Sequence, residues 1–383
     1  MKLSILLPTR NGGALLEPVI RSVLEQDCDD FELVVSNNAS ADATPEIIAS
    51  FASDPRLRVV TLEQPVDVTD NWNRALHAAT GDYVTLIGDD DLLLSGYFER
   101  VFGLLEEYED PDSLTFNAYA YAFPGFAGAE HSHYADPFYV PQPIVPSDGL
   151  VSARTRRHLV SEMFSFRFPV HLNMQTALVS RRMFERLPRG LFRPPFPDFY
   201  GLNAIMLVAD RWAISAAKPV VVGVSPKSFG RTLHGREQGA GLRYLGISTA
   251  FEGQLPGSEV MNGTHLTLVE LERDFPAALA GLTIDRDEYV MAQAYTWYVH
   301  RRLGSLASRE VLARLRLLSA RDWAGLVRMS ASRLRPAKLR RALRMDRDAP
   351  VADLWPGMRP LPEVSDIVEF ARWIDARRAE PDA

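Results

Sequence analysis

Three consecutive aspartates, Asp89, Asp90 and Asp91, follow an apolar run at positions 83–87. Adjacent carboxylates repel one another unless a cation or solvent lies between them. If the backbone stays extended, Asp89 and Asp91 share one side, because side chains alternate along a strand. One or two carboxylates with substrate phosphates are typical ligands of Mg²⁺. The pattern indicates a metal and phosphate site; the alternative is a solvated acidic turn that caps a helix over residues 92–107.

The segments around the aspartates alternate between short apolar runs and amphipathic stretches. We predict strands over 2–7, 31–35, 57–62 and 83–87, and helices over 13–25, 40–51 and 70–79, the second capped by Ser40. Strands that alternate with helices imply right-handed crossovers and a mainly parallel sheet. Ligands of such sheets bind beyond the carboxyl ends of the strands. Thr9, Asn37 and the three aspartates fall at that edge.

The second half of the chain is less regular. Residues 123–150 are rich in Pro, Gly, His and Tyr, which predicts a long loop or lid. Strand and helix patterns resume over 175–180, 181–187, 198–209 and 219–224, and the pattern is helical beyond about residue 260. We therefore predict an α/β domain over residues 1–240 and a mostly helical C-terminal region over 241–383.

Composition excludes several classes of protein. The 383 residues are 46% hydrophobic and 24% charged, which excludes a disordered, collagen-like or disulfide-stapled chain. The single cysteine, Cys28, cannot form an internal disulfide, which favours a reducing compartment. We see no signal peptide and no apolar stretch of about 18 residues that could span a membrane. We expect a cytoplasmic protein.

Charge is distributed unevenly. The net charge is -7, but residues 301–347 hold fourteen Lys and Arg against three acids, a net +11, so the rest carries -18. Three interpretations stay open for this basic segment: a helical bundle whose arginines are solvated or pair with the acidic body, peripheral contact with an anionic membrane surface, or nucleic acid. Nucleic acid is disfavoured, because the motifs and stacking aromatic residues that would support it are missing.

Four short motifs in the first hundred residues carry a family resemblance. They are LSILLPTRN (3–11), VSNNASAD (35–42), NWNRA (71–75) and ATGDYV (79–84), followed by the aspartates. In this order and spacing they resemble a family 2 glycosyltransferase of the GT-A fold, which is Rossmann-like. The resemblance implies a nucleotide-diphosphate sugar as donor, Mg²⁺ or Mn²⁺ as cofactor, and transfer of the sugar with inversion.

The resemblance also implies roles for individual residues. It assigns the donor to Pro8, Thr9, Asn11, Asn37, Asn73, Asp89 and Asp90, and the metal to Asp89, Asp91 and His234. Asn37 stands where many members have an aspartate that contacts the base or ribose; its alternative is a turn residue with a local backbone hydrogen bond. The alternative for His234, an ordinary loop histidine, is the favoured one, and Arg231 and Arg236 are candidates for the diphosphate.

An acid in the second half matches the family's general base. Residues 176–200 resemble the acceptor side of the family, and Asp198 falls at the position of the base. An inverting transfer needs one carboxylate to accept the proton of the attacking hydroxyl. The alternative for Asp198 is a helix N-cap after Pro197. Asp210 and Glu185 are the other candidates.

Two further functions are weighed against the transferase. A sugar-1-phosphate nucleotidyltransferase should carry a glycine-rich and basic loop after its first strand, and residues 9–13 offer a single arginine. A catalytically idle sugar-nucleotide-binding or scaffolding protein of the same fold stays open because of Asn37. The expected acceptor is a saccharide, a lipid-linked or a small molecule, in polysaccharide or glycoconjugate biosynthesis.

Overall fold

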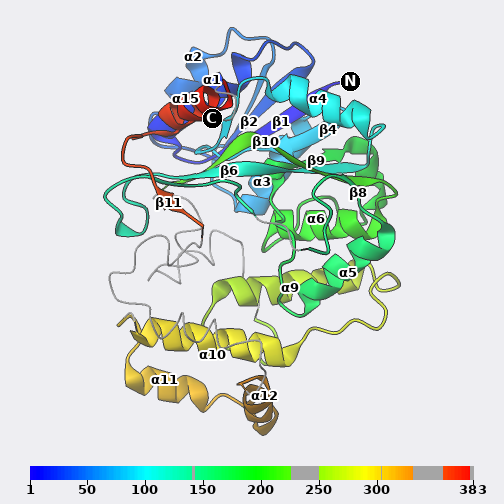
Figure 1. The fold of residues 1–383 in the computed structure, drawn as a ribbon, viewed down its shortest axis with the longest axis vertical. Helices are drawn as coiled ribbons and strands as arrows, with labels where there is room; N and C mark the ends of the chain where they lie inside the picture. The colour runs from blue at the N-terminus through cyan, green and yellow to red at the C-terminus, as the bar shows by residue number, and fades with distance from the viewer. Residues whose placement is uncertain (140–142, 226–249, 303, 331–356, 380–383) are drawn as a thin grey trace.

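The computed structural model describes residues 1–139, 143–225, 250–302, 304–330 and 357–379 (Figure 1). In this part of the chain, eleven strands form one sheet in the order β11-β7-β6-β9-β4-β1-β2-β3, with β10 paired to β5, β6 and β8. The strands are β1 (Leu3–Thr9), β2 (Phe31–Asn37), β3 (Leu57–Thr61), β4 (Tyr83–Leu86), β5 (Leu92–Leu93), β6 (Ser113–Ala122), β7 (His133–Ala135), β8 (Gly149–Leu150), β9 (Ala177–Ser180), β10 (Trp212–Val224) and β11 (Arg359–Pro360).

Helices cover both faces of this sheet. The helices of the described residues, including those that lie away from the sheet, are α1 (Leu16–Leu24), α2 (Thr44–Ser50), α3 (Val68–Ala78), α4 (Tyr97–Glu107), α5 (Ala153–Phe164), α6 (Pro197–Val208), α9 (Glu259–Asp274), α10 (Arg286–Arg302), α11 (Ser308–Leu315), α12 (Ala320–Ser330) and α15 (Ile367–Ala379). Short 3-10 turns are η1 (Gly13–Leu15), η2 (Phe126–Gly128), η3 (Met174–Thr176) and η4 (Arg181–Arg186). Alternate residues of β1 enter different cores: Ile5 and Leu7 pack with α1 and α4, and Leu6 packs with α3, α5 and α6.

The strand directions bring several carboxyl ends to one edge. β1 runs parallel to β2 and β4, and β10 runs parallel to β6. β9 is antiparallel to both β4 and β6, so β6 and β10 run in the same direction as β1. The predicted α/β architecture with a helical C-terminal region is confirmed, although the sheet is mixed because β9 inserts between two strands of the other direction.

The helix that we predicted over residues 92–107 begins only at Tyr97. Leu92 and Leu93 instead form β5, antiparallel to β10. Side chains of α1 and of the turn after it bind the backbone of this segment: Ser22 Oγ accepts from Leu93 N at 3.2 Å, and Gln26 donates to Leu94 O at 3.1 Å and accepts from Tyr97 N at 3.2 Å. The prediction is wrong here because these contacts are long-range.

The predicted N-cap at Ser40 is also wrong. Helix α2 begins at Thr44, and Ser40 lies in the preceding loop. There its N–H donates to Asn37 Oδ1 at 3.1 Å and its Oγ accepts from Asn11 N at 2.9 Å. Ser40 therefore joins the loops after β1 and β2 instead of starting a helix.

The helices after residue 250 lie away from the sheet, with α11 and α12 at the far end of the molecule (Figure 1). Their buried centre includes Leu255, Tyr289 and Trp297. Helix α15, in contrast, returns to the sheet, where Phe370 packs on Tyr121 of β6. The predicted domain boundary near residue 240 falls outside the described residues, so it stays a prediction.

Candidate active site

Thr9 and Asp89 meet at the carboxyl edge of the sheet. Thr9 is the last residue of β1, and its hydroxyl donates a hydrogen bond of 2.6 Å to Asp89 Oδ2. A Cβ at Gly12 would lie 2.7 Å from Thr9 Oγ1 and 3.0 Å from Asp89 Oδ2, so the chain passes this pair too closely for a side chain. Asp89 itself stays partly exposed. Thr9 and Asp89, which we expected at one edge of the sheet, are thus in contact.

The chain turns at residues 88–91, which we call the aspartate turn. Asp91 is only 1% exposed; its Oδ2 accepts from Gly88 N at 2.5 Å and its Oδ1 from Gly223 N at 2.9 Å. Burial, followed by the charge of Asp90, raises the pKa of Asp91, although both backbone hydrogen bonds lower it. The backbone is not extended here, so Asp89 and Asp91 do not alternate as on a strand.

The end of β10 closes on the aspartate turn. Asp90 Oδ2 accepts a hydrogen bond from Ser225 N at 3.2 Å. A Cβ at Gly223 would lie 1.7 Å from the carbonyl oxygen of Asp90, so only glycine fits there. The side chain of Gln175 lies near Asp91 and lowers its pKa. Our sequence analysis missed Gly223 and Gln175; the signal for Gly223 was a glycine inside a strand pattern, which often marks close approach of another backbone.

Asn37 ends β2 beside Thr9, its partner in the parallel register. The side chain is buried, and its Oδ1 accepts the hydrogen bond from Ser40 N described above. The local backbone hydrogen bond that we gave as the alternative is therefore present. Asn11, exposed and in the left-handed region with φ 55°, accepts from Ala41 N at 2.8 Å and so ties the same two loops together.

Two other predicted donor residues lie farther along this surface. Pro8 is partly exposed in β1. Asn73 of α3 donates to Phe192 O at 3.2 Å, and the ring of its neighbour Trp72 packs edge-on against Phe192 at 5.2 Å. Helix α3 thereby holds the segment that leads into α6 and Asp198.

Asp198 lies in the first turn of α6. The N-cap of this helix is Phe196, so Asp198 is not the cap that we gave as its alternative. Its Oδ1 accepts from the N–H of Phe199 at 2.8 Å. Although the residue is partly exposed, burial of the carboxyl group raises the pKa of Asp198 to about 6. A carboxylate with a pKa near neutral is suited to accept a proton from a hydroxyl.

The two other acids considered for this role lie at the opposite edge. Asp210 precedes β10, whose first residue pairs with the first residue of β6, and it forms an exposed ion pair of 2.7 Å with Arg186. Glu185 is exposed on η4, directly after antiparallel β9. Helix α6 leads from Asp198 toward this edge over about 18 Å. Asp198 is therefore at the helix end away from it.

The predicted histidine ligand cannot be placed. His234, Arg231 and Arg236 lie outside the described residues. Among the residues that the structure does describe, no group of three His, Cys, Asp or Glu side chains could hold a metal ion. His133 lies in β7, between β6 and β11, and its Nδ1 is 3.1 Å from the carbonyl oxygen of His131.

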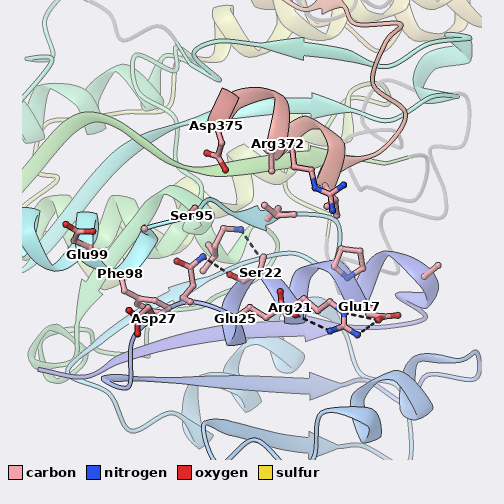
Figure 2. Close-up of a pocket in the computed structure, with 18 residues that line it drawn as sticks. Glu17, Arg21, Ser22, Glu25, Asp27, Ser95, Phe98, Glu99, Arg372 and Asp375 are labelled. Carbon is pink, nitrogen blue, oxygen red and sulfur yellow. Dashed lines mark hydrogen bonds and ion pairs between the residues drawn. The ribbon is translucent and has the colours of Figure 1, made fainter. Parts of the chain in front are cut away.

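A groove of about 790 Å³ lies between α1, the start of α4 and α15 (Figure 2). Of the donor and metal residues that the structure describes, none lines it. Along α1, Arg21 pairs with Glu17 at 2.8 Å and with Glu25 at 3.1 Å, and across from them lie Arg372 and Asp375 of α15. Ser22 and Gln26, which bind the segment after the aspartate turn, also line this groove.

A sheet that gathers polar loops at its carboxyl edge and carries a helical appendage is the architecture of GT-A glycosyltransferases. The structure of S. aureus TarS 1-349 in complex with UDP-GlcNAc shares this fold, with a TM-score of 0.50 and 16% identity over 82% of this chain and 90% of that one. Residues 4–171 match the model described as Glycosyl transferase family 2. The N-terminal region of the chain is therefore a glycosyl transferase family 2 domain.

Curated relatives match the same region. A GalNAc(5)-diNAcBac-PP-undecaprenol beta-1,3-glucosyltransferase of Campylobacter jejuni is 38% identical over 25% of this chain and 31% of its own length. A PGL/p-HBAD biosynthesis glycosyltransferase of Mycobacterium bovis is 35% identical over 28% of this chain and 43% of its own. The matched region is thus less than half the length of either relative.

Proposed function

We propose that the protein is a glycosyltransferase that moves a sugar, with inversion, from a nucleotide-diphosphate sugar to an acceptor hydroxyl. The observation that carries the proposal is the contact between Thr9 and Asp89, at the carboxyl edge of a family 2 domain. This edge is where open α/β sheets bind their ligands. The donor would lie over Pro8, Thr9, Asn11 and Asn37, with Asn73, Asp89 and Asp90 beside it.

We include Mg²⁺ or Mn²⁺ in this proposal. The oxygen donors of the aspartate turn fit such hard cations, which take few protein carboxylates and complete their shell with phosphates and water. Asp89 is partly exposed and would contact the metal. Asp91 would hold the aspartate turn and so orient Asp89, because both oxygens of Asp91 already accept backbone hydrogen bonds. When bound, the cation would stabilise the charge of the leaving diphosphate. His234 stays a candidate for a third ligand.

We assign the general base to Asp198. Its raised pKa leaves the carboxylate ionised at neutral pH and still basic enough to accept the proton of the acceptor hydroxyl. The contacts of Asn73 and Trp72 in α3 with Phe192 support this assignment. They fix the segment that leads to Asp198 relative to the donor side of the sheet. The proposed lid over residues 123–150 would exclude water, which competes as an acceptor.

For the acceptor we propose a saccharide, either lipid-linked or free. The relative from Campylobacter jejuni, whose name includes an undecaprenol-linked diphosphate, supports the lipid-linked form. No helix within the described residues has the length and apolar character to cross a bilayer. We therefore propose a cytoplasmic enzyme that reaches such an acceptor at the inner face of the membrane, without nucleic acid as a partner.

The experiment that tests the function is thermal unfolding against UDP-, dTDP- and GDP-sugars with Mn²⁺ or EDTA, followed by assays of sugar release. A ligand at about 100 times its dissociation constant adds about 2.7 kcal/mol of stability, which shifts the midpoint by a few degrees. We expect a shift with one nucleotide, in the presence of metal, and slow release of its sugar to water. Binding without release or transfer to any tested acceptor would favour the idle scaffold, and no shift across the panel would contradict the proposal.

A further inference from the structure

Helix α12 turns an apolar face to the solvent. Its buried face consists of Asp322 and Gly325 with partly buried Leu326 and Met329, packed toward α10. The contacts are polar: Arg286 Nε pairs with Asp322 Oδ1 at 3.0 Å, and Arg328 pairs with Asp287. At 3.6 residues per turn, the side opposite holds Ala320, Trp323, Ala324 and Val327, all exposed. Helix α12 thus carries apolar side chains on both faces, with Leu326 toward the core and Trp323 and Val327 toward the solvent.

The exposed side chains are large. Trp323 is 45% exposed and Val327 is 69% exposed, and the spacing of four residues makes them neighbours on the helix. Leu312 of α11 and Leu317, in the connection to α12, are 58% and 57% exposed. Isolated exposed apolar residues need no explanation, but a group of them within sixteen positions does.

Arginines surround this apolar group. Over residues 308–330 the chain has five arginines against two acids. One of these acids, Asp322, is buried and paired, and the other, Glu310, accepts from Ala307 N at 2.8 Å in the cap of α11. Arg309, Arg316 and Arg321 are exposed. The exposed side chains of this stretch are therefore mainly apolar residues and arginines, and its net charge is positive.

Among the residues that the structure describes, this surface lies at one end of the molecule. Helices α11 and α12 lie on the same side of α10, at the end of the molecule opposite to the sheet (Figure 1). Of the leucines nearby, Leu306 and Leu318 are buried against α10, whereas Leu312 and Leu317 point away from that core. We call Leu312, Leu317, Trp323 and Val327, with Arg309, Arg316 and Arg321, the α11–α12 surface.

We propose that the α11–α12 surface docks on a bilayer that contains anionic lipids. Tryptophan side chains favour the boundary between acyl chains and headgroups, and short apolar helices with basic flanks lie in that plane. Arginine stems pack along the apolar groups while their guanidinium groups reach the phosphates. The exposed arginines favour binding to an anionic surface over binding to a second copy of this chain, because the same surface on a second copy is also positive.

The test is sedimentation of the full chain with vesicles of phosphatidylcholine alone or of equal parts phosphatidylcholine and phosphatidylglycerol. We expect binding to the mixed vesicles, and binding about tenfold weaker or worse for the double variant Trp323→Ser/Val327→Ser, which loses the apolar contact. The matched control Val59→Ser/Val269→Ser removes two valines that are 42% and 39% exposed elsewhere, and should bind as the wild type does.

Charge is tested in the same way. Arg316→Glu/Arg321→Glu should weaken binding about tenfold or more, whereas Arg100→Glu/Arg154→Glu, at exposed positions outside the surface, should have a much smaller effect. Vesicles of brominated lipid should quench the fluorescence of Trp323. The variant Trp323→Phe should still bind the vesicles but lose that part of the quenching. Unchanged binding by the apolar double variant, no binding to any vesicle, or dimers abolished by that variant would each overturn the proposal. No sugar transfer is needed for these measurements, so their failure is distinct from failure of the proposed function.

Discussion

The carboxyl edge of the sheet and the α11–α12 surface break the usual arrangement of side chains in opposite ways. At the edge, carboxylates that prefer water are drawn inward, as with Asp91, which is 1% exposed between Gly88 and Gly223. On α12, a tryptophan and a valine that prefer a core face outward, while Asp322 lies inside.

Each exception costs free energy in the isolated protein, and the cost has different causes. An ionised carboxylate loses solvation when it is buried, whereas an exposed apolar side chain forgoes the gain of burial. Stability alone explains neither Asp198 nor Trp323. We therefore expect that replacing Asp198 or Trp323 reduces catalysis or membrane binding and leaves stability unchanged or higher, unlike replacement of residues that hold the fold.

Asp198→Asn should show the largest effect on activity. Without the carboxylate that accepts the acceptor proton, transfer should fall by about 10²- to 10⁴-fold while the donor still binds. In the wild type, kcat/KM should fall as the pH drops below about 6, because a protonated Asp198 cannot act as base. Transfer kinetics and donor-induced thermal shifts would check both. Asp210→Asn, at the far end of α6, is the matched control, and wild-type turnover by Asp198→Asn would disprove the assignment.

The same variant tests the stability side of the comparison. Burial raises the pKa of Asp198 from 3.8 to about 6, so the folded protein binds a proton more readily than the unfolded chain does. Ionisation of this group therefore lowers the free energy of unfolding as the pH rises from about 4 through 6. At about pH 8, Asp198→Asn should be as stable as the wild type or more so. Urea unfolding of the wild type and of Asp198→Asn at about pH 4 and about pH 8 measures this difference in stability.

Gly223→Ala should damage the edge itself. The added Cβ would lie 1.7 Å from the carbonyl oxygen of Asp90, so β10 must move away from the aspartate turn. We expect a loss of about 1–3 kcal/mol in the free energy of unfolding, together with a smaller thermal shift by donor and metal. Gly103→Ala in α4 is the control: no atom lies within 4 Å of its Cβ, and it should gain about 0.5–1 kcal/mol. Equal stability of the two variants would contradict the packing argument.

Asp89→Asn and Asp91→Asn should separate contact with the metal from support of the turn. Asp89 is partly exposed, so its variant should fold normally and lose the metal-dependent part of the donor shift. Asp91 accepts from two backbone N–H groups; an asparagine there would put an amide donor against one of them, at a cost of about 1–3 kcal/mol. Thermal unfolding with Mn²⁺ and with EDTA distinguishes them. Loss of stability in Asp89→Asn and not in Asp91→Asn would reverse the assignment.

Much of the α/β fold could be predicted because its signals are local. The apolar runs that became β1, β2 and β4 and the amphipathic pattern of α1 appear within a few turns of chain. The start of α4 could not be predicted, since it depends on Gln26, seventy residues earlier, which binds the backbone of 94 and 97. The insertion of antiparallel β9 likewise depends on pairing with strands distant in sequence.

The site divides in the same manner. Motif spacing indicated Thr9 and the three aspartates, and the structure shows the contact between Thr9 and Asp89. The closure of β10 on Asp90 and Asp91 was not predictable, because Gly223 lies more than one hundred residues from them. The sequence left open whether the basic segment forms a helical bundle or contacts a membrane, and it did not show which of its leucines would be exposed. Their exposure depends on how α11 and α12 pack against α10.

The smallest effect on stability is expected at the α11–α12 surface. Trp323→Ser and Val327→Ser remove side chains that make few contacts in the isolated protein, so each should change the free energy of unfolding by no more than about 0.5 kcal/mol. Trp297, 1% exposed in α10, provides the contrast, because Trp297→Ala should cost about 3–5 kcal/mol. Urea unfolding of the three variants measures the difference. If Trp323→Ser lowered the free energy of unfolding as much as Trp297→Ala does, Trp323 would be part of the core. The apolar residues on the outer face of α12 would then need no lipid to explain them.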